Sequence, residues 1–89
     1  SPTDRYIYAI AIIMGPNNDN SKVTTPADLG SRVRARRRDI GLTQTELALA
    51  AGVSITFVTQ LERGKPTAQI GKVFELLAAL GLELEMKQR

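Results

Sequence analysis

The chain has 89 residues and a formal net charge of +3, with no cysteine and no histidine. A chain of this length forms one small domain with a thin core, which is often stabilised by association with a second copy. The composition excludes disulfides and the usual zinc sites and removes the commonest general acid–base residue, whereas the mild positive charge is compatible with nucleic acid without establishing it.

The first 24 residues divide into an apolar segment and a polar linker. Residues 6–14 are almost entirely apolar, but a membrane-spanning helix needs about 20 such residues. The segment also lacks the cleavage pattern of a signal peptide. Its β-branched and tyrosine content favours a strand. Either this strand pairs with another element, or it lies upstream of a natural start at Met14. Residues 15–24 are polar turn-formers, which is typical of a linker.

A first helix is predicted over residues 26–40. Thr25 can cap its N-terminus, and Pro26 suits its first position. Gly41 supplies the left-handed residue that ends such a helix. The regular part of the chain therefore begins at Thr25.

Two short helices separated by a glycine turn follow. Thr43 and Glu46 have the spacing of a capping box, in which each side chain binds the other residue's backbone N–H. Gly52 ends this helix, Ser54 caps the next one, and Gly64 ends that one. The spacing indicates a helix-turn-helix, in which a scaffold helix holds a second helix in the DNA major groove.

The outward face of the second helix is predicted to read DNA bases. Its polar stripe, at i, i+3, i+4 and i+7, consists of Thr56, Thr59, Gln60 and Arg63. Glutamine can bind adenine bidentately, and threonine offers a hydroxyl and a methyl group to base edges. The N-terminus of this helix leads into the groove, whereas Phe57 is expected to pack inward. The predicted base-reading residues are Ser54, Ile55, Thr56, Thr59 and Gln60. The alternative is an ordinary solvated face.

Phosphate contacts are predicted around these helices. Backbone N–H groups at the start of the helix after Thr43 favour an anion, and Gln44 can add a hydrogen bond. The arginines of residues 26–40 go round their helix, so only Arg32 or Arg36 is expected to reach phosphate. Arg37 is expected to pack inward against Glu62. The predicted phosphate contacts are Thr43, Gln44, Arg63, Lys65 and Arg32.

A last amphipathic helix and a strand complete the chain. The helix is predicted from the apolar spacing of Ile70, Val73, Phe74, Leu77 and Leu80, and Gly81 ends it. Residues 82–87 alternate apolar and charged, as in a strand with one buried face. A single strand needs a partner, and its copy in a second chain is the simplest one. The predicted dimer strand uses Leu82, Leu84 and Met86.

From about Thr25 to Met86 the sequence resembles the Xre (Cro/C1-type) helix-turn-helix family. The resemblance rests on the residues 32–37, 41–48, 51–54 and 61–66. It implies a mainly α, lambda-repressor-like bundle of four to five helices with a partly buried pair, Arg37 and Glu62. It also implies base-reading positions at Ser54, Ile55, Thr56 and Gln60 and a phosphate-binding glutamine at Gln44.

Residues 66–84 further resemble the HipB-like antitoxins. These bacterial proteins accompany HipA-type serine/threonine kinase toxins, dimerise partly through a C-terminal strand and bind operator DNA upstream of their own operon. The resemblance implies a homodimer on an inverted repeat of double-stranded DNA, a kinase partner and a cytoplasmic, nucleoid-associated location. The first 24 residues match nothing in this family.

Taken together, the sequence predicts three parts and one function. Residues 1–24 have no assigned role, residues 25–81 form the DNA-binding domain, and residues 82–87 form the dimerisation strand. The expected function is an autoregulating repressor and antitoxin, without metal or cofactor. The alternatives are a phage- or chromosome-type repressor with no toxin and a protein-interaction module. An enzyme is disfavoured because no nucleophile–base pair or metal cluster is visible.

Overall fold

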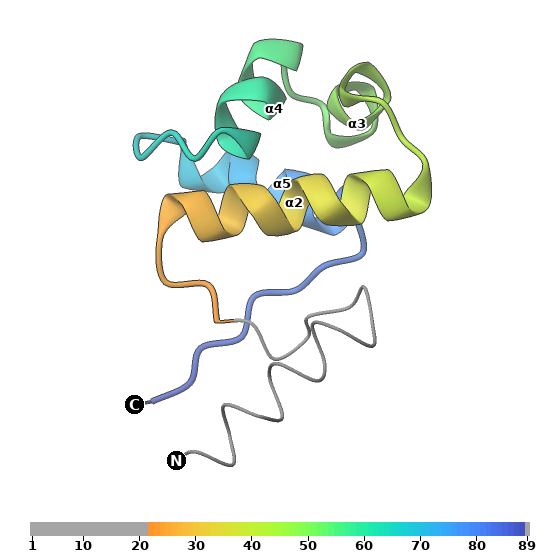
Figure 1. Cartoon of the computed structure of the whole chain (residues 1–89). Helices are drawn as coiled ribbons and strands as arrows, with labels where there is room; N and C mark the ends of the chain where they lie inside the picture. Colours follow the sequence, from red (N-terminus) through yellow and green to blue (C-terminus); the bar gives the residue numbers. More distant parts are fainter. Residues whose placement is uncertain (1–21, 89) are drawn as a thin grey trace.

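The computed structural model describes residues 22–88, which contain four helices (Figure 1). These are α2 (Pro26–Ile40), α3 (Gln44–Ala51), α4 (Ile55–Glu62) and α5 (Ile70–Ala79). The predicted helices are confirmed, and the mainly α helix-turn-helix fold is the one expected. The apolar segment 6–14 and most of the linker lie outside the described residues.

The helix ends follow the local signals in the sequence. Capping boxes are present at Thr25 with Asp28 and at Thr43 with Glu46, and the Ser54 hydroxyl accepts a hydrogen bond from the N–H of Phe57. The four glycines predicted to end helices all have positive φ, between 68° and 88°. A residue with a Cβ is strained in that region, which explains glycine at these positions.

The helices pack as two pairs around one core. In Figure 1, α3 and α4 lie on one side of the bundle, and α2 and α5 lie on the other. Helix α2 packs against α4, and α3 packs against both α4 and α5. The fully buried residues are Val33, Leu47, Ala48, Val58, Leu61, Val73, Leu76, Leu77 and Leu80. None of the described helices has the length and apolar character needed to cross a membrane.

Gly30 allows α2 and α4 to approach closely. A Cβ built on Gly30 would lie 2.9 Å from the carbonyl oxygen of Glu62 and closer still to that of Leu61. Any side chain larger than hydrogen would therefore push the two helices apart. The contact sets the depth at which α4 sits on α2.

The buried face of α5 differs from the prediction. Val73, Leu76, Leu77 and Leu80 are buried, at the i, i+3, i+4 and i+7 positions of one helix face. Ile70 is 64% exposed and Phe74 is 53% exposed, so these two members of the apolar spacing that predicted the helix lie at the surface.

Residues 82–88 form no strand in this single chain. They leave α5 as an extended tail that leads away from α3 and α4 (Figure 1). Leu82 still packs against the core, whereas Leu84 is 45% exposed and Met86 is 99% exposed. The strand was predicted to pair with a second chain, so its pairing stays a prediction.

Candidate nucleic-acid interface

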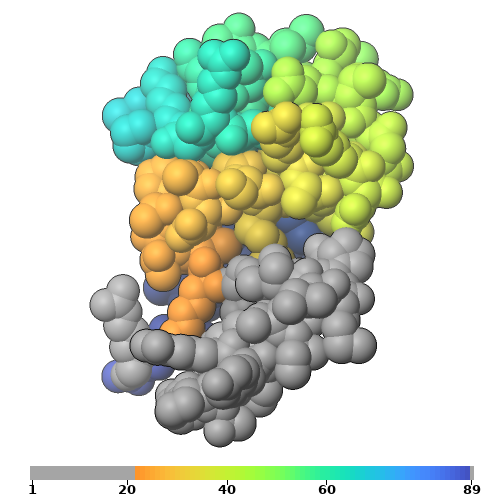
Figure 2. Space-filling model, in the orientation of Figure 1, coloured from red at the N-terminus to blue at the C-terminus, as the bar shows by residue number. Residues whose placement is uncertain are grey.

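The first turn of α4 is presented at the surface. Ser54, Ile55 and Thr56 are exposed, and Ile55 keeps 49% of its surface accessible. The opposite face of α4 buries Val58 and Leu61 in the core. Figure 2 shows α3 and α4 together forming one end of the molecule, in the green and teal colours of their residues. An accessible helix N-terminus of this kind can enter a major groove.

An ion pair anchors the C-terminal end of α4 to α2. Arg37 Nε donates to Glu62 Oε2 at 2.7 Å, and Arg37 Nη2 donates to Oε1 at 3.1 Å. The side chains are 11% and 3% exposed, respectively. The predicted inward pair is therefore present, with the two-point geometry that arginine and carboxylate favour. Arg37 Nη1 also donates to the Leu42 carbonyl at 2.8 Å.

This ion pair keeps Glu62 charged. Burial alone would raise the pKa of its carboxyl group, but hydrogen bonds from Arg37 and Gln44 outweigh burial and lower the pKa below the ordinary 4.5. The positive charges of Arg37 and Arg34 act in the same direction. The pKa of Arg37 is raised, chiefly by its hydrogen bonds to Glu62.

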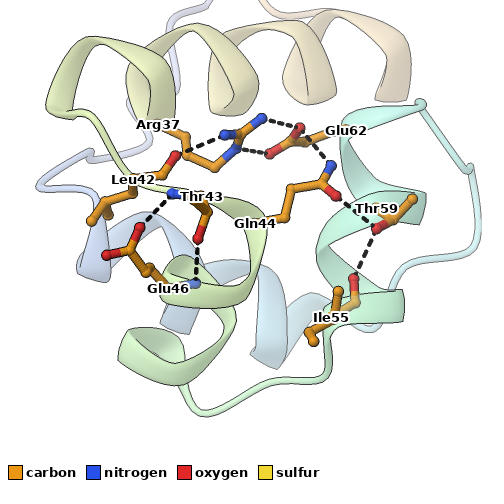
Figure 3. A network of polar contacts seen from close by, with 8 residues as sticks. All are labelled: Arg37, Leu42, Thr43, Gln44, Glu46, Ile55, Thr59 and Glu62. Carbon is orange, nitrogen blue, oxygen red and sulfur yellow. Dashed lines mark hydrogen bonds and ion pairs between the residues drawn. The ribbon is translucent and has the colours of Figure 1, made fainter.

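Gln44 and Thr59 join the same network, shown in Figure 3. Gln44 Nε2 donates to Glu62 Oε1 at 3.1 Å, and Thr59 Oγ1 lies 3.2 Å from Gln44 Oε1. The Thr59 hydroxyl is also 3.0 Å from the Ile55 carbonyl oxygen, and its single proton is donated to one of these two acceptors at a time. Both residues were predicted to contact DNA; they are half-buried in this chain, and the DNA contacts stay predictions. The backbone bond of Thr59 to Ile55 is readable from the sequence, because threonine in a helix often binds the i−4 carbonyl.

The remaining predicted contacts surround α4. Gln60 is half-buried, and its Oε1 accepts a hydrogen bond from Lys65 Nζ at 3.1 Å. Arg63 and Lys65 are exposed beyond the end of the helix. The Thr43 hydroxyl caps α3 by accepting from the N–H of Glu46 at 3.1 Å. The predicted contacts from Ser54 to Lys65 therefore lie on α4 or next to its ends, and α3 packs against this helix.

The α2 arginines are divided between two sides of the domain. Arg36 Nε donates to the Leu80 carbonyl at 3.0 Å, which directs this side chain to the end of α5. Arg32 is half-buried.

Phe57 packs against the core as expected, with Lys72 Nζ 5.9 Å from its ring centroid. Lys72 was not among the predicted residues, because only the fold brings α5 beside α4.

The sequence matches a known family model and two curated proteins. Residues 33–86 match the model HTH_3, described as helix-turn-helix. An uncharacterized HTH-type transcriptional regulator of Sinorhizobium fredii, y4mF, is 49% identical over 65 residues, covering 73% of this chain and 86% of that protein. A second regulator of the same organism, y4dJ, is 37% identical over 54 residues, covering 61% of this chain and 70% of its own.

Solved structures share the fold. The HipB-O4 20mer complex contains a chain with a TM-score of 0.71 and 24% identity, covering 76% of this chain and 96% of that chain. A chain in the structure of a HipA-HipB-O2-O3 complex gives the same values. At this identity the likeness establishes the arrangement of the helices alone.

Proposed function

This chain belongs to the HTH_3 helix-turn-helix family of DNA-binding transcriptional regulators, and on that premise we propose that it is a dimeric, operator-binding repressor and the antitoxin of a HipA-type kinase module. The observation that carries the proposal is the exposed first turn of α4, on a helix whose other end is fixed by the Arg37–Glu62 pair. A rigid helix with a free N-terminal turn has the form of a major-groove reader.

Base reading is assigned to the accessible side of α4. Ser54, Ile55 and Thr56 offer two hydroxyls and an apolar group at its N-terminus, and the apolar group suits a thymine methyl. Gln60 accepts from Lys65 through Oε1, and its amide nitrogen is a donor for a base acceptor. Phosphate binding is assigned to Thr43 and Gln44 at the start of α3 and to Arg63, Lys65 and Arg32.

The test is binding to the DNA upstream of the chain's own gene. Affinity is measured for this duplex and for an unrelated duplex of equal length over a salt series. We expect a log–log slope of about −0.9 per phosphate neutralised. Gln60→Ala is expected to lose discrimination at one or two base pairs, by about 1–3 kcal/mol. Gln88→Ala, an exposed glutamine of the tail, is the control. Equal affinity of the wild type for both duplexes would refute the proposal.

Dimerisation is assigned to the tail. Antiparallel pairing about Glu85 places Leu84 opposite Met86 and Glu83 opposite Lys87, whereas pairing about Leu84 would oppose two glutamates. Sedimentation equilibrium tests this register. Lys87→Glu should weaken the dimer, and adding Glu83→Lys in the same chain should restore it. If neither change alters the dissociation constant, the paired tail is wrong.

The kinase partnership is supported by the fold shared with a HipB chain from a complex that also contains HipA. It predicts a HipA-like serine/threonine kinase encoded beside this gene. Co-expression of both chains followed by affinity purification should recover a stoichiometric complex with reduced kinase activity. Recovery of operator binding without any such complex would assign the chain to repressors that have no toxin partner.

A further inference from the structure

We propose that Arg34 on α2 binds a backbone phosphate of the DNA, between the phosphates assigned to Gln44 and to Arg63. The inference rests on the proposed operator binding and adds a residue to it. On α2 the sequence assigned this role to Arg32 or Arg36, because the position of a residue on an isolated helix does not show which side faces DNA. The contacts between α2 and the end of α4 place Arg34 on that side.

The side of α2 that carries Arg34 faces the last turn of α4. Gly30, four residues earlier, packs against that turn, where a Cβ on Gly30 would lie 2.9 Å from the Glu62 carbonyl oxygen. Arg37, three residues later, donates to Glu62 Oε2 at 2.7 Å. Residues three and four apart share one side of a helix. Arg34 therefore lies between two residues that touch Glu62, on the same side of α2.

The same side of α2 also meets the chain just beyond α4. A Cβ built on Gly64 would lie 2.8 Å from the Ala27 Cα atom, and Ala27 precedes Arg34 by about two helical turns. Gly64 lies between Arg63 and Lys65, which are both exposed and are both assigned to phosphate. Arg34 therefore lies on the side of α2 that adjoins these two cations, although it belongs to a different helix.

The charge of Arg34 is not needed to satisfy Glu62. The Glu62 carboxylate accepts two hydrogen bonds from Arg37 and one from Gln44 at the start of α3 (Figure 3). Burial raises the pKa of Glu62, these hydrogen bonds lower it, and the positive charge of Arg34 lowers it further, as expected of a neighbouring cation. Among residues 22–88 the Arg34 guanidinium forms no hydrogen bond or ion pair, and the side chain is exposed. A cation is therefore available at the surface above the Arg37–Glu62 pair.

Arginine at this position suits a phosphate. Its planar guanidinium can donate two parallel hydrogen bonds to phosphate oxygens, at the end of a long side chain. Gln44 binds the Glu62 carboxylate, and Arg63 directly follows Glu62 in the chain. The contacts of Gln44, Arg34 and Arg63 then form one row around Glu62, contributed by α3, α2 and the end of α4, which a single DNA strand can follow.

The test compares Arg34→Met with Arg34→Lys and with Arg36→Met, a matched control whose guanidinium binds the Leu80 carbonyl at the end of α5. Each variant of the whole chain is titrated with the operator and with an unrelated duplex over a salt series. Arg34→Met is expected to lose about tenfold in affinity for both duplexes at low salt, with a log–log slope shallower by about 1 per bound chain. Arg34→Lys should keep the wild-type slope because it keeps the charge, and Arg36→Met should also keep it.

Uncharged phosphates locate the contact. Operator duplexes are prepared in which a methylphosphonate replaces one phosphate at a time. At one position in each half-site this replacement should weaken wild-type binding but add nothing to the loss caused by Arg34→Met, because the two changes remove the same interaction. That position should lie between the positions at which Gln44→Met and Arg63→Met are insensitive in the same way.

Other outcomes overturn the inference. A wild-type salt slope for Arg34→Met would exclude the contact, and equal slope changes in Arg34→Met and Arg36→Met would reflect net charge alone. Urea unfolding tests for a structural role: a large loss of stability in Arg34→Met without a change in slope would make Arg34 a structural partner of Glu62. A wild type without operator preference would instead refute the proposed function, and the unrelated duplex would still report the phosphate contact.

Discussion

The two ends of the domain differ in their polar contacts and in the apolar side chains that they expose. At the α3–α4 end both helices begin with a side-chain cap, and polar side chains are joined from Arg37 through Glu62 to Thr59. At the other end α5 begins without a side-chain cap, and Phe74 and Met86 are exposed. A single chain therefore satisfies the polar groups at the end that is proposed to bind DNA. The tail is where the proposed second copy would add contacts.

The largest expected effect is at the ion pair. Arg37→Met should leave Glu62 as an uncompensated buried charge and lower the free energy of unfolding by about 3–5 kcal/mol. Urea denaturation followed by circular dichroism measures the change. Arg38→Met removes the same charge from an exposed neighbour and should change stability by less than about 0.5 kcal/mol. If both variants lost similar amounts of unfolding free energy, the Arg37–Glu62 ion pair would not be what stabilises the α3–α4 end.

The close approach of α2 and α4 gives the next effect. Gly30→Ala places a methyl group against the carbonyl oxygens of Leu61 and Glu62 and should cost about 1–3 kcal/mol by forcing the helices apart. Gly71→Ala meets no atom within 4 Å and should stabilise α5 by about 0.5 kcal/mol, because alanine has the better helix propensity. Thermal unfolding should show a lower melting temperature for Gly30→Ala and a higher one for Gly71→Ala. A shift in the same direction for both variants would contradict the close packing of α2 against α4.

Acid should affect the α3–α4 end through Glu62. Its folded-state pKa is lowered, so its stabilisation is complete above the unfolded-state pKa and is lost as the pH falls through the folded-state value. We expect wild-type stability to decline below about pH 4.5. In Glu62→Gln this part of the decline should be absent, although Asp28 and Glu46 also have lowered pKa values and contribute. Parallel pH profiles for the two proteins would exclude Glu62 as the cause.

The smallest effect is expected on α5. Phe74 is 53% exposed, so Phe74→Ser should change the stability of dilute protein by less than about 1 kcal/mol. Leu76→Ala, on the buried side of the same helix, should cost about 2–5 kcal/mol. A loss from Phe74→Ser as large as that from Leu76→Ala would show that the exposed face is covered even in dilute solution, which would remove the contrast between the two ends.

Local signals explain why the helix boundaries were predictable. Thr43 with Glu46 and the glycine at position 52 act within a few residues of chain, so their effect can be derived from the sequence. Helical spacing predicted the apolar stripe of α5 but not which of its residues are buried. The spacing within one helix does not say how much of the stripe its neighbours cover. Leu76 and Phe74 are both apolar, yet the packing of the helices buries the first and leaves the second 53% exposed.

In the candidate site, too, some features follow from local sequence and others depend on how the helices pack. The polar stripe of α4 was derived from helical geometry, but Thr59 lies at its edge, where it meets Gln44 from another helix. Long-range pairing of this kind depends on how two helices cross, and no spacing within α4 reports it. The start of α4 at Ser54 needed no such information, because the cap of a helix is defined by its own residues.

By itself the sequence determined the four helices, their ends and the polar character of α4, because capping, turn chemistry and periodicity act over short stretches of chain. The pairing of Arg37 with Glu62, which are 25 residues apart, was implied by the family resemblance. The tertiary structure decided which polar groups remain available to a ligand and which are used internally. Hydrogen-bond partners such as Gln44 and Glu62 are separated by 18 residues, and only the packing of α2, α3 and α4 brings them within reach.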